Sequence, residues 1–394
     1  MYVHELCASW LATPLWRKSF MIDSCASLDK IVASDIKEAW IDTAKGLDLR
    51  MEMPSEDQPG VEQYIRSAAV AGGYKSIASV PLEAELATAV NLLNRSKEAV
   101  CSMFHEARMG KAVKLESAML LVEEIAASVI RNPSALISLA RLKTADDYIY
   151  MHSVAVCALM IGLSRQIDLD DDETREAGLA GLLHDIGKLA VPLDILNKPG
   201  KLSDAEFSAV KEHPAAGYLI LLKGDGVGAI ALDVCLHHHE KMDGSGYPDG
   251  LAGDQIGMHA RMGAICDVYD AITSNRPYKQ GWCPAESLQK MTEWSMGHFD
   301  PTIFAAFVKC IGIYPVGTLV RLKSGRLGLV VEQQTGKSLL RPKVRVFYSS
   351  KSLAYITPEL INLAAPGLQD EIVMREDADK WGLKDIDRYW HCGS

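Results

Sequence analysis

The sequence lacks several features that define large classes of protein. Its nine cysteines form no Cys-x-x-Cys pair, which excludes a disulfide framework and a zinc knuckle and indicates free thiols in a reducing compartment. Positive charge is in deficit, with 41 lysines and arginines against 51 acidic residues and a net charge of −10, which argues against the wrapping of DNA or RNA. No apolar run is long enough to span a bilayer, and no signal peptide opens the chain. We therefore expect a cytoplasmic protein.

The composition that remains is typical of a large globular chain. Of its 394 residues, 48% are hydrophobic and 23% are charged, so the chain can bury a sizeable core. At roughly 150 residues per domain, this length predicts two or three domains.

Hydrophobic patterning divides the chain into four parts. Residues 1–80 have short apolar pieces separated by turn-forming residues, which predicts a small α/β domain. Residues 81–110 have the period of a helical linker, and residues 111–313 continue with a series of helices that predicts a bundle. Residues 314–394 are rich in β-branched residues between turns and predict a small antiparallel β module. The predicted fold is therefore multidomain and mainly α.

Several helix boundaries can be predicted from capping residues. Asp146 and Asp147 are placed to cap a helix that ends near Ile167, and the acidic run 171–173 opens the next helix. That helix is expected to end at His184-Asp185 and to be closed by Gly187. Residues 203–206 form a capping box that opens a helix to Leu222, and a further helix is predicted over 254–274.

The most informative feature is the clustering of histidine. Six of the eleven histidines lie between residues 152 and 239, most of them beside a carboxylate. Neutral imidazoles and carboxylates bind divalent metals, and helices of a bundle can bring such side chains together. With no cysteine among the ligands, the site suits iron, manganese, nickel, cobalt or zinc. The candidate ligands are His152, His184, Asp185, His213, His238, His239 and Asp267.

Seven ligands exceed the needs of one tetrahedral ion and predict a site for two, with Asp185 bridging them. Two ions about 3.5–4 Å apart can activate water and hold a phosphodiester for in-line attack. The alternative interpretation is that these histidines are hydrogen-bonded core and capping residues without a metal. We favour the metal site because so many candidates occur in ordered motifs.

These motifs resemble those of the HD-GYP phosphodiesterases. The resemblance is carried by 184–188 (HDIGK), 213–214 (HP), 238–248 (HHEKMDGSGYP) and 267–279 (DVYDAITSNRPYK), and it covers residues 110–313. It implies a helical HD-domain core that hydrolyses cyclic di-GMP. Residues 1–15 resemble the uncharacterised domain that often precedes HD-GYP domains in bacterial proteins.

The resemblance implies a role for individual residues. The seven candidate ligands match the family's metal ligands, and Asp185 also counts as catalytic. Lys188 matches the lysine that contacts the scissile phosphate, where a fixed ammonium can stabilise developing charge. Asp270 lies one helical turn beyond Asp267 and is predicted to orient the attacking water or Lys188. Arg276 and Lys279 match contacts to the substrate phosphates.

The loop 243–248 contains glycines that permit a positive φ or a close backbone approach, and Pro248 stiffens it. We expect the loop to form a lip of the active site, with Tyr247 contacting substrate and diguanylate cyclase domains as candidate docking partners. For Tyr247 alone, a structural role in a tight turn is an equal alternative.

The chain departs from one pattern within the family. Some members have a glutamate one helical turn before the first histidine, which supplies a third metal site, but this chain has Tyr148 there. Asp147 would point about 100° away around the helix, so we predict two metals, not three. His237 is predicted to be structural or to support a ligand. The other histidines, His4, His105, His259, His298 and His391, are predicted to lie on the surface or to support a ligand.

The predicted function is metal-dependent hydrolysis of cyclic di-GMP to linear pGpG, with a second cut to GMP left open. One alternative is an HD-GYP enzyme for another cyclic dinucleotide such as cyclic GMP-AMP. Another is a non-catalytic receptor or docking module, which the intact ligand set, Lys188 and Asp270 disfavour. The sequence does not fix the oligomeric state.

Overall fold

The structure is a computed structural model of the chain, which divides into two compact units, residues 1–60 and 61–394. The described residues are 2–6, 20–21, 39–41, 78–141, 148–196, 198, 200–224, 226–274, 281–333, 338–386 and 388–391. In the first unit they form an antiparallel sheet of order β2-β1-β3, with strands β1 (Tyr2–Leu6), β2 (Phe20–Met21) and β3 (Ala39–Ile41). The helices predicted for this part lie outside the described residues.

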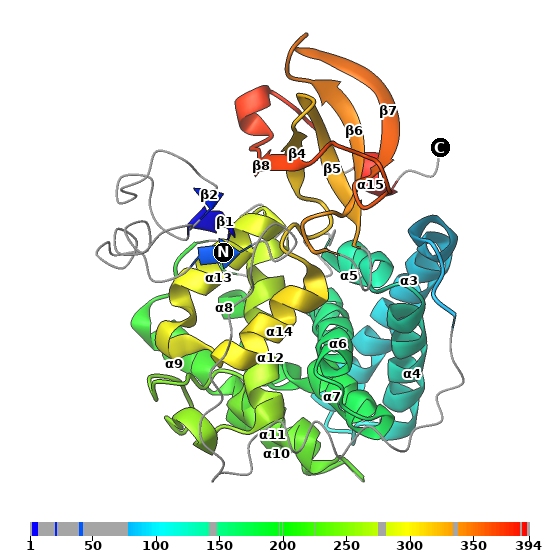
Figure 1. Cartoon of the computed structure of the whole chain (residues 1–394). Coiled ribbons are helices and arrows are strands. Elements are labelled where there is room, and N and C mark those ends of the chain that lie inside the picture. Colours follow the sequence, from blue (N-terminus) through cyan, green and yellow to red (C-terminus); the bar gives the residue numbers. More distant parts are fainter. Residues whose placement is uncertain are drawn as a thin grey trace, which may run out of the picture. The chain divides into compact units, whose positions relative to one another are not determined.

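The second unit begins with a helical domain, as predicted (Figure 1). Its long helices are α3 (Leu82–Arg108), α4 (Leu115–Arg131), α5 (Pro133–Arg141), α6 (Tyr148–Gln166), α7 (Asp171–Leu183), α9 (Asp204–Lys211), α10 (His213–Leu221), α11 (Ala229–His237), α12 (Met258–Thr273), α13 (Pro284–His298) and α14 (Pro301–Ile311). Short segments are η3 (Ile186–Ala190), α8 (Leu193–Leu196) and η4 (Gly253–Gln255).

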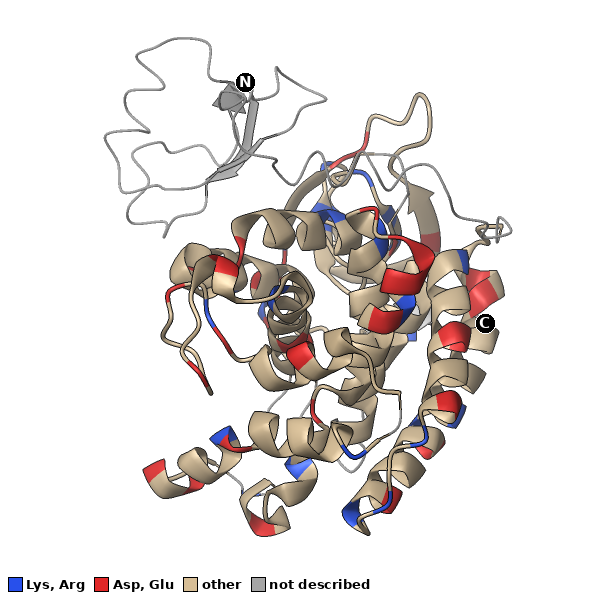
Figure 2. Ribbon diagram, turned by 90° about the horizontal axis from the view of Figure 1, so that it is seen from below, with Lys and Arg blue, Asp and Glu red and all other residues tan. Residues whose placement is uncertain are grey.

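Helix α6 forms the centre of the bundle. Every residue in 151–164 is buried, and the helix packs against α7, α12, α5 and α14. A helix that is apolar on all sides is expected in such a position. Acidic and basic residues alternate along the outer helices, as the ribbon colours in Figure 2 show. Helix α6 therefore supplies part of the buried interior in which the candidate ligands lie.

Three predicted helix boundaries are wrong. The helix predicted over 254–274 begins only at Met258, after the separate segment η4. The helix opened by the Ser203 capping box, which is present as predicted, ends at Lys211, and α10 starts anew at His213. Pro214 explains the break because it lacks an amide hydrogen and restricts the residue before it. Gly187 does not close α7, which ends at Leu183, but lies inside η3.

Close packing explains why residue 187 is glycine. A Cβ atom there would lie 1.8 Å from the backbone oxygen of His213 and 2.4 Å from the nitrogen of Gly217. Backbone of η3 and α10 is therefore in contact, and this contact fixes His213 relative to the His184-Asp185 pair.

The C-terminal part is a five-stranded antiparallel sheet of order β7-β6-β5-β4-β8. Its strands are β4 (Leu319–Leu322), β5 (Arg326–Glu332), β6 (Lys343–Ser349), β7 (Ala354–Asn362) and β8 (Ile372–Arg375), followed by η5 (Asp379–Trp381) and α15 (Arg388–His391). Alternate residues of β5 enter different cores, as the period of a strand requires. Leu327 and Leu329 join the core of the helical domain, whereas Val330 packs with the opposite face of the sheet.

The mainly helical fold with an antiparallel C-terminal β module thus agrees with the prediction. Within the described part of the chain, we find no helix whose length and hydropathy would let it cross a membrane.

Candidate metal centre

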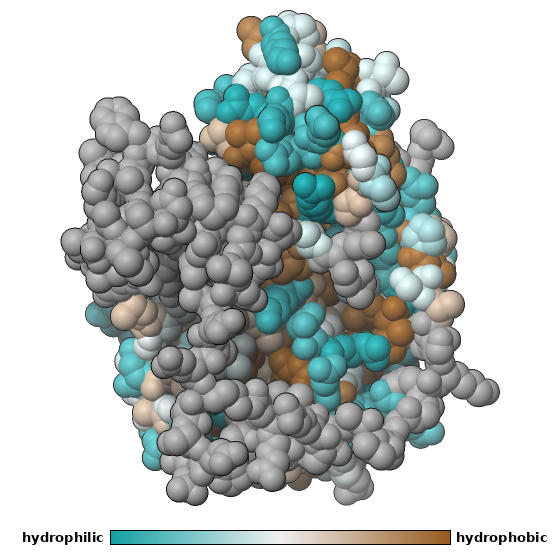
Figure 3. All heavy atoms as spheres, viewed as in Figure 1, coloured by the Kyte–Doolittle hydropathy of each residue, from teal (hydrophilic) through white to brown (hydrophobic). Residues whose placement is uncertain are grey.

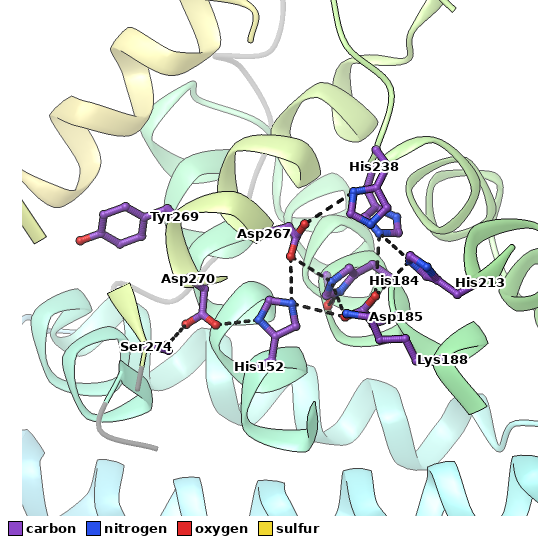
Figure 4. Close-up of polar contacts among 12 residues, drawn as sticks. His152, His184, Asp185, Lys188, His213, His238, Asp267, Tyr269, Asp270 and Ser274 are labelled. Carbon is purple, nitrogen blue, oxygen red and sulfur yellow. Dashed lines mark hydrogen bonds and ion pairs between the residues drawn. The ribbon is translucent and has the colours of Figure 1, made fainter. Parts of the chain in front are cut away.

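The candidate ligands come from five parts of the helical domain and meet in its interior. His152 lies on α6, His184 and Asp185 follow α7, and His213 begins α10. His238 and His239 follow α11, and Asp267 lies on α12. Figure 4 shows the labelled members of this set pointing toward one another. The structure therefore brings the seven predicted ligands to one place.

The ligand atoms form two groups of three, and the atoms of each group lie within 4.8 Å of one another. The first group is His152, His184 and Asp185, and the second is His213, His238 and His239. The first offers two imidazoles and a carboxylate and the second three imidazoles, and both donor sets suit a divalent ion.

Two carboxylates connect the groups. Asp185 Oδ2 lies 3.4 Å from Nε2 of both His152 and His184, while its Oδ1 lies 3.3 Å from His213 Nε2. Asp267 spans the groups in the same way, with Oδ1 2.9 Å from His152 Nε2 and Oδ2 3.9 Å from His239 Nδ1. Each carboxylate therefore presents one oxygen to each group.

Hydrogen bonds on the outer side orient four of the imidazoles. His184 Nδ1 lies 2.8 Å from Gly181 O, His213 Nδ1 2.7 Å from Val210 O, and His238 Nδ1 3.0 Å from Val234 O. His152 Nδ1 instead lies 2.6 Å from Asp270 Oδ2. Such partners fix the tautomer and leave Nε2 free of its proton for a metal.

Unsatisfied polar atoms support a metal at this position. His184 Nε2 and Asp185 Oδ1 are buried and have no hydrogen-bond partner within the described part of the chain. Buried polar groups are normally paired, and an exception calls for an explanation. A divalent cation would satisfy both atoms, so the residues present fit a metal and do not merely form a histidine-rich core.

The electrostatics of the cluster favour an ionised Asp185 and neutral imidazoles at His238 and His239. Burial tends to raise the pKa of Asp185, but the charges of Lys188 and His184 hold that pKa well below its usual range. Burial lowers the pKa of His239 to about 3. Burial also lowers the pKa of His184, yet the nearby Asp185 carboxylate outweighs it and raises this pKa to about 10.

Lys188 and Asp270 occupy different sides of the cluster. The Lys188 ammonium donates a hydrogen bond to the Asp185 carboxylate, and about a fifth of its side chain is exposed. Asp270 contacts His152 and the hydroxyl of Ser274. The sequence predicted that Asp270 would orient water or Lys188, whereas the structure places it behind a candidate ligand.

The loop 243–248 lies beside the second group. Tyr247 stacks on the His239 ring, with centroids 4.7 Å apart, and Lys211 Nζ lies 5.2 Å from the Tyr247 ring centroid. Gly244 has a φ of +77°, and a Cβ atom on Gly246 would lie 2.4 Å from Glu240 Cα. The glycines therefore serve the positive φ and the close approach that the sequence predicted.

Two contributions to the site were missed at the level of sequence. Glu240 is buried, and its Oε1 accepts hydrogen bonds from the backbone of Asp249 at 2.7 Å and Gly250 at 2.9 Å. It anchors the end of the loop, although its only sequence signal is its place after the histidine pair. The second is Lys211, which lies two residues before His213. The sequence predicted one continuous helix here, so the contact between Lys211 and Tyr247 could not be predicted from it.

The other residues singled out in the sequence lie away from the two groups or outside the described part of the chain. His237 lies between Asp233 (2.7 Å) and Asp249 (3.2 Å) and so faces away from the two groups. Arg276 and Lys279 lie outside the described residues, as does the Tyr148 side chain.

The helical architecture and this His-Asp cluster define an HD-domain protein. Residues 121–303 match the HD domain family, and residues 1–118 match a family described as a domain of unknown function, DUF3391. The chain is 55% identical to the cyclic di-GMP phosphodiesterase PA4108 of Pseudomonas aeruginosa over 391 residues. These matched residues cover 99% of this chain and 92% of that protein. The chain therefore belongs to the HD-GYP family of cyclic di-GMP phosphodiesterases.

Two further relatives match less than half of the chain. The cyclic di-GMP phosphodiesterase response regulator RpfG of Xanthomonas campestris is 40% identical over 151 residues, which cover 37% of this chain and 39% of RpfG. The 3'3'-cGAMP-specific phosphodiesterase 3 of Vibrio cholerae is 38% identical over 170 residues, which cover 43% of this chain and 37% of that enzyme. The matched relatives thus include two substrate classes.

The contact between Asp270 and His152 leads to a first prediction. Asp270→Ala removes the partner of His152 Nδ1 and is expected to weaken metal binding about 10–100-fold, since supporting residues of a metal site have effects of this size. Excess metal should restore most of the activity. Metal titration of the apoprotein measures the change.

Ser274→Ala is the matched control because it removes a different contact of Asp270, at 3.1 Å, and leaves the carboxylate on His152. An unchanged metal affinity in Asp270→Ala would show that this contact does not support the site.

Proposed function

We propose that the chain hydrolyses cyclic di-GMP to linear pGpG with two divalent metal ions bound at the His-Asp cluster. The observation that carries the proposal is the position of Asp185, whose two oxygens face the two groups of histidines at 3.3–3.4 Å. The 55% identity to a cyclic di-GMP phosphodiesterase along nearly the whole chain supports the substrate.

We assign the first ion to His152, His184 and Asp185 and the second to His213, His238 and His239, with Asp185 and Asp267 shared between them. When bound, such ions lower the pKa of water and polarise the oxygens of a phosphodiester. The nitrogen and oxygen donors suit iron, manganese, nickel, cobalt or zinc.

The protein's own groups then supply orientation and charge. Lys188 stays fixed by its contact with Asp185, so its ammonium can stabilise negative charge that develops on the phosphorane oxygens. Asp270 holds the His152 ring at 2.6 Å. Arg276 and Lys279 follow α12 in the sequence and would bind the remaining phosphate of the ring.

A second candidate substrate is a mixed cyclic GMP-AMP, because a relative specific for it is 38% identical over 170 residues. We favour cyclic di-GMP because that relative matches 43% of the chain, whereas the cyclic di-GMP enzyme matches 99%.

The proposal is tested with the full-length, metal-loaded protein and chromatography of its products. We expect cyclic di-GMP to yield pGpG, and yield it faster than 3'3'-cGAMP yields its linear product. Faster turnover of 3'3'-cGAMP would identify this dinucleotide, and not cyclic di-GMP, as the preferred substrate. Binding of cyclic di-GMP without any linear product would identify a receptor.

A further inference from the structure

A cavity of about 560 Å³ is lined in part by α6 and α12, two of the helices that contribute candidate metal ligands. Helix α6 contributes Ala155, Leu159, Gly162 and Arg165 to its wall, one to four turns beyond His152. Arg165 is 13 residues from His152, which corresponds to about 20 Å along the helix. The outer end of the cavity is therefore well separated from the metal ligands.

The wall of the cavity is mainly apolar. Parts of α4, α5, α12, α14 and the start of the C-terminal sheet enclose it, and their apolar side chains include Val129, Ile137, Ile311 and Val316. Figure 3 shows apolar atoms exposed between the C-terminal sheet and the helical domain. Gly162 deepens the space, because a Cβ atom there would lie 3.1 Å from Cys310 Sγ. The volume lies in the range of about 300–1,000 Å³ found for small-molecule sites.

Positive charge gathers at this cavity in an otherwise acidic chain. Arg165 and Lys309 both line it and are exposed, and neither forms an ion pair with a carboxylate of the described residues. Asp270 is the one acid among the described lining residues, and its carboxylate contacts His152 and Ser274. Asp171, which lies outside the lining, interacts electrostatically with Arg165 without forming an ion pair. Within the described part of the chain, the two cations are therefore not held in ion pairs and can contact an occupant.

We propose that this cavity binds a small amphipathic anion, with its apolar chain or ring among the α5 and α6 side chains and its carboxylate or phosphate between Arg165 and Lys309. Arginine suits this role because its guanidinium can hold either group through two parallel hydrogen bonds. The occupant would contact Asp270, whose carboxylate contacts the candidate ligand His152. Asp270 would therefore connect the occupant to the metal centre. The proposal does not depend on the substrate of the enzyme.

Isothermal titration calorimetry of the full chain with decanoate, decyl phosphate and 1-decanol tests the site. We expect saturable binding of at least one of the two anions to a single site, with 1-decanol binding more weakly. The double variant Arg165→Gln/Lys309→Gln should bind the anion at least about tenfold more weakly, since charged hydrogen bonds contribute this much. The two anions distinguish a carboxylate ligand from a phosphate ligand.

The matched control is Arg108→Gln/Lys223→Gln, which removes two exposed cations away from the cavity and should leave binding unchanged. Ile137→Trp fills the apolar part and should abolish binding. The proposal is overturned if neither anion saturates, if the Arg165/Lys309 variant binds as tightly as the control, or if cyclic di-GMP displaces the anion competitively.

Discussion

Asp185→Asn is expected to abolish hydrolysis of cyclic di-GMP and to strip metal from the cluster. Asparagine keeps the size of the side chain but removes the charge that faces both groups of histidines, and its amide nitrogen cannot bind a cation. Because the electrostatic stabilisation of the reaction depends on this charge, kcat should fall roughly 10³-fold or more. Product chromatography gives the rate, and elemental analysis of the same sample gives the metal content.

Asp233→Asn is the matched control for this variant. Asp233 also pairs with an imidazole, that of His237 at 2.7 Å, but it lies outside both metal groups. We expect it to retain metal and turnover, with circular dichroism confirming that both variants are folded. A folded Asp185→Asn protein that keeps its activity and metal would remove Asp185 from the mechanism.

Gly187→Ala is expected to have the largest effect on stability. The added Cβ atom would lie 1.8 Å from the backbone oxygen of His213, and backbone cannot turn aside as a flexible side chain can. Separating η3 from α10 would also displace His213 from Asp185. We expect the free energy of unfolding to fall by about 3 kcal/mol or more, together with a loss of metal binding.

Gly382→Ala separates this packing effect from backbone strain. Gly382 has a φ of +63° and no atom within 4 Å of an added Cβ, so its cost should be only about 1–2 kcal/mol. Denaturant titration of both variants measures the difference. Equal stability losses would show that the contact between Gly187 and α10 does not constrain the fold.

The sequence predicted the helical fold and the meeting of the candidate ligands because those signals are local. Periodicity and capping residues mark helices such as α7, and the order of the motifs restricts how the helices can pack. A buried helix such as α6 has little amphipathic pattern. His152 on this helix could still be identified because it matches a metal ligand of the family that the sequence resembles.

Contacts between distant segments could not be predicted in the same way. The pairing of Asp270 with His152 depends on the relative rotation of α6 and α12, which no residue spacing specifies. The role of Gly187 requires the approach of α10, which begins only because Pro214 interrupts the preceding helix. Glu240 was overlooked because its partners are backbone amides nine and ten residues later.

The number of ions bound per chain tests the central claim most directly. Elemental analysis of purified wild-type protein, with His184→Ala and His238→Ala measured alongside, would count them. We predict two divalent ions per wild-type chain and fewer in each variant, since each substitution removes a ligand from a different group. A folded wild-type protein that binds no divalent ion after incubation with iron, manganese, nickel, cobalt or zinc would contradict the account.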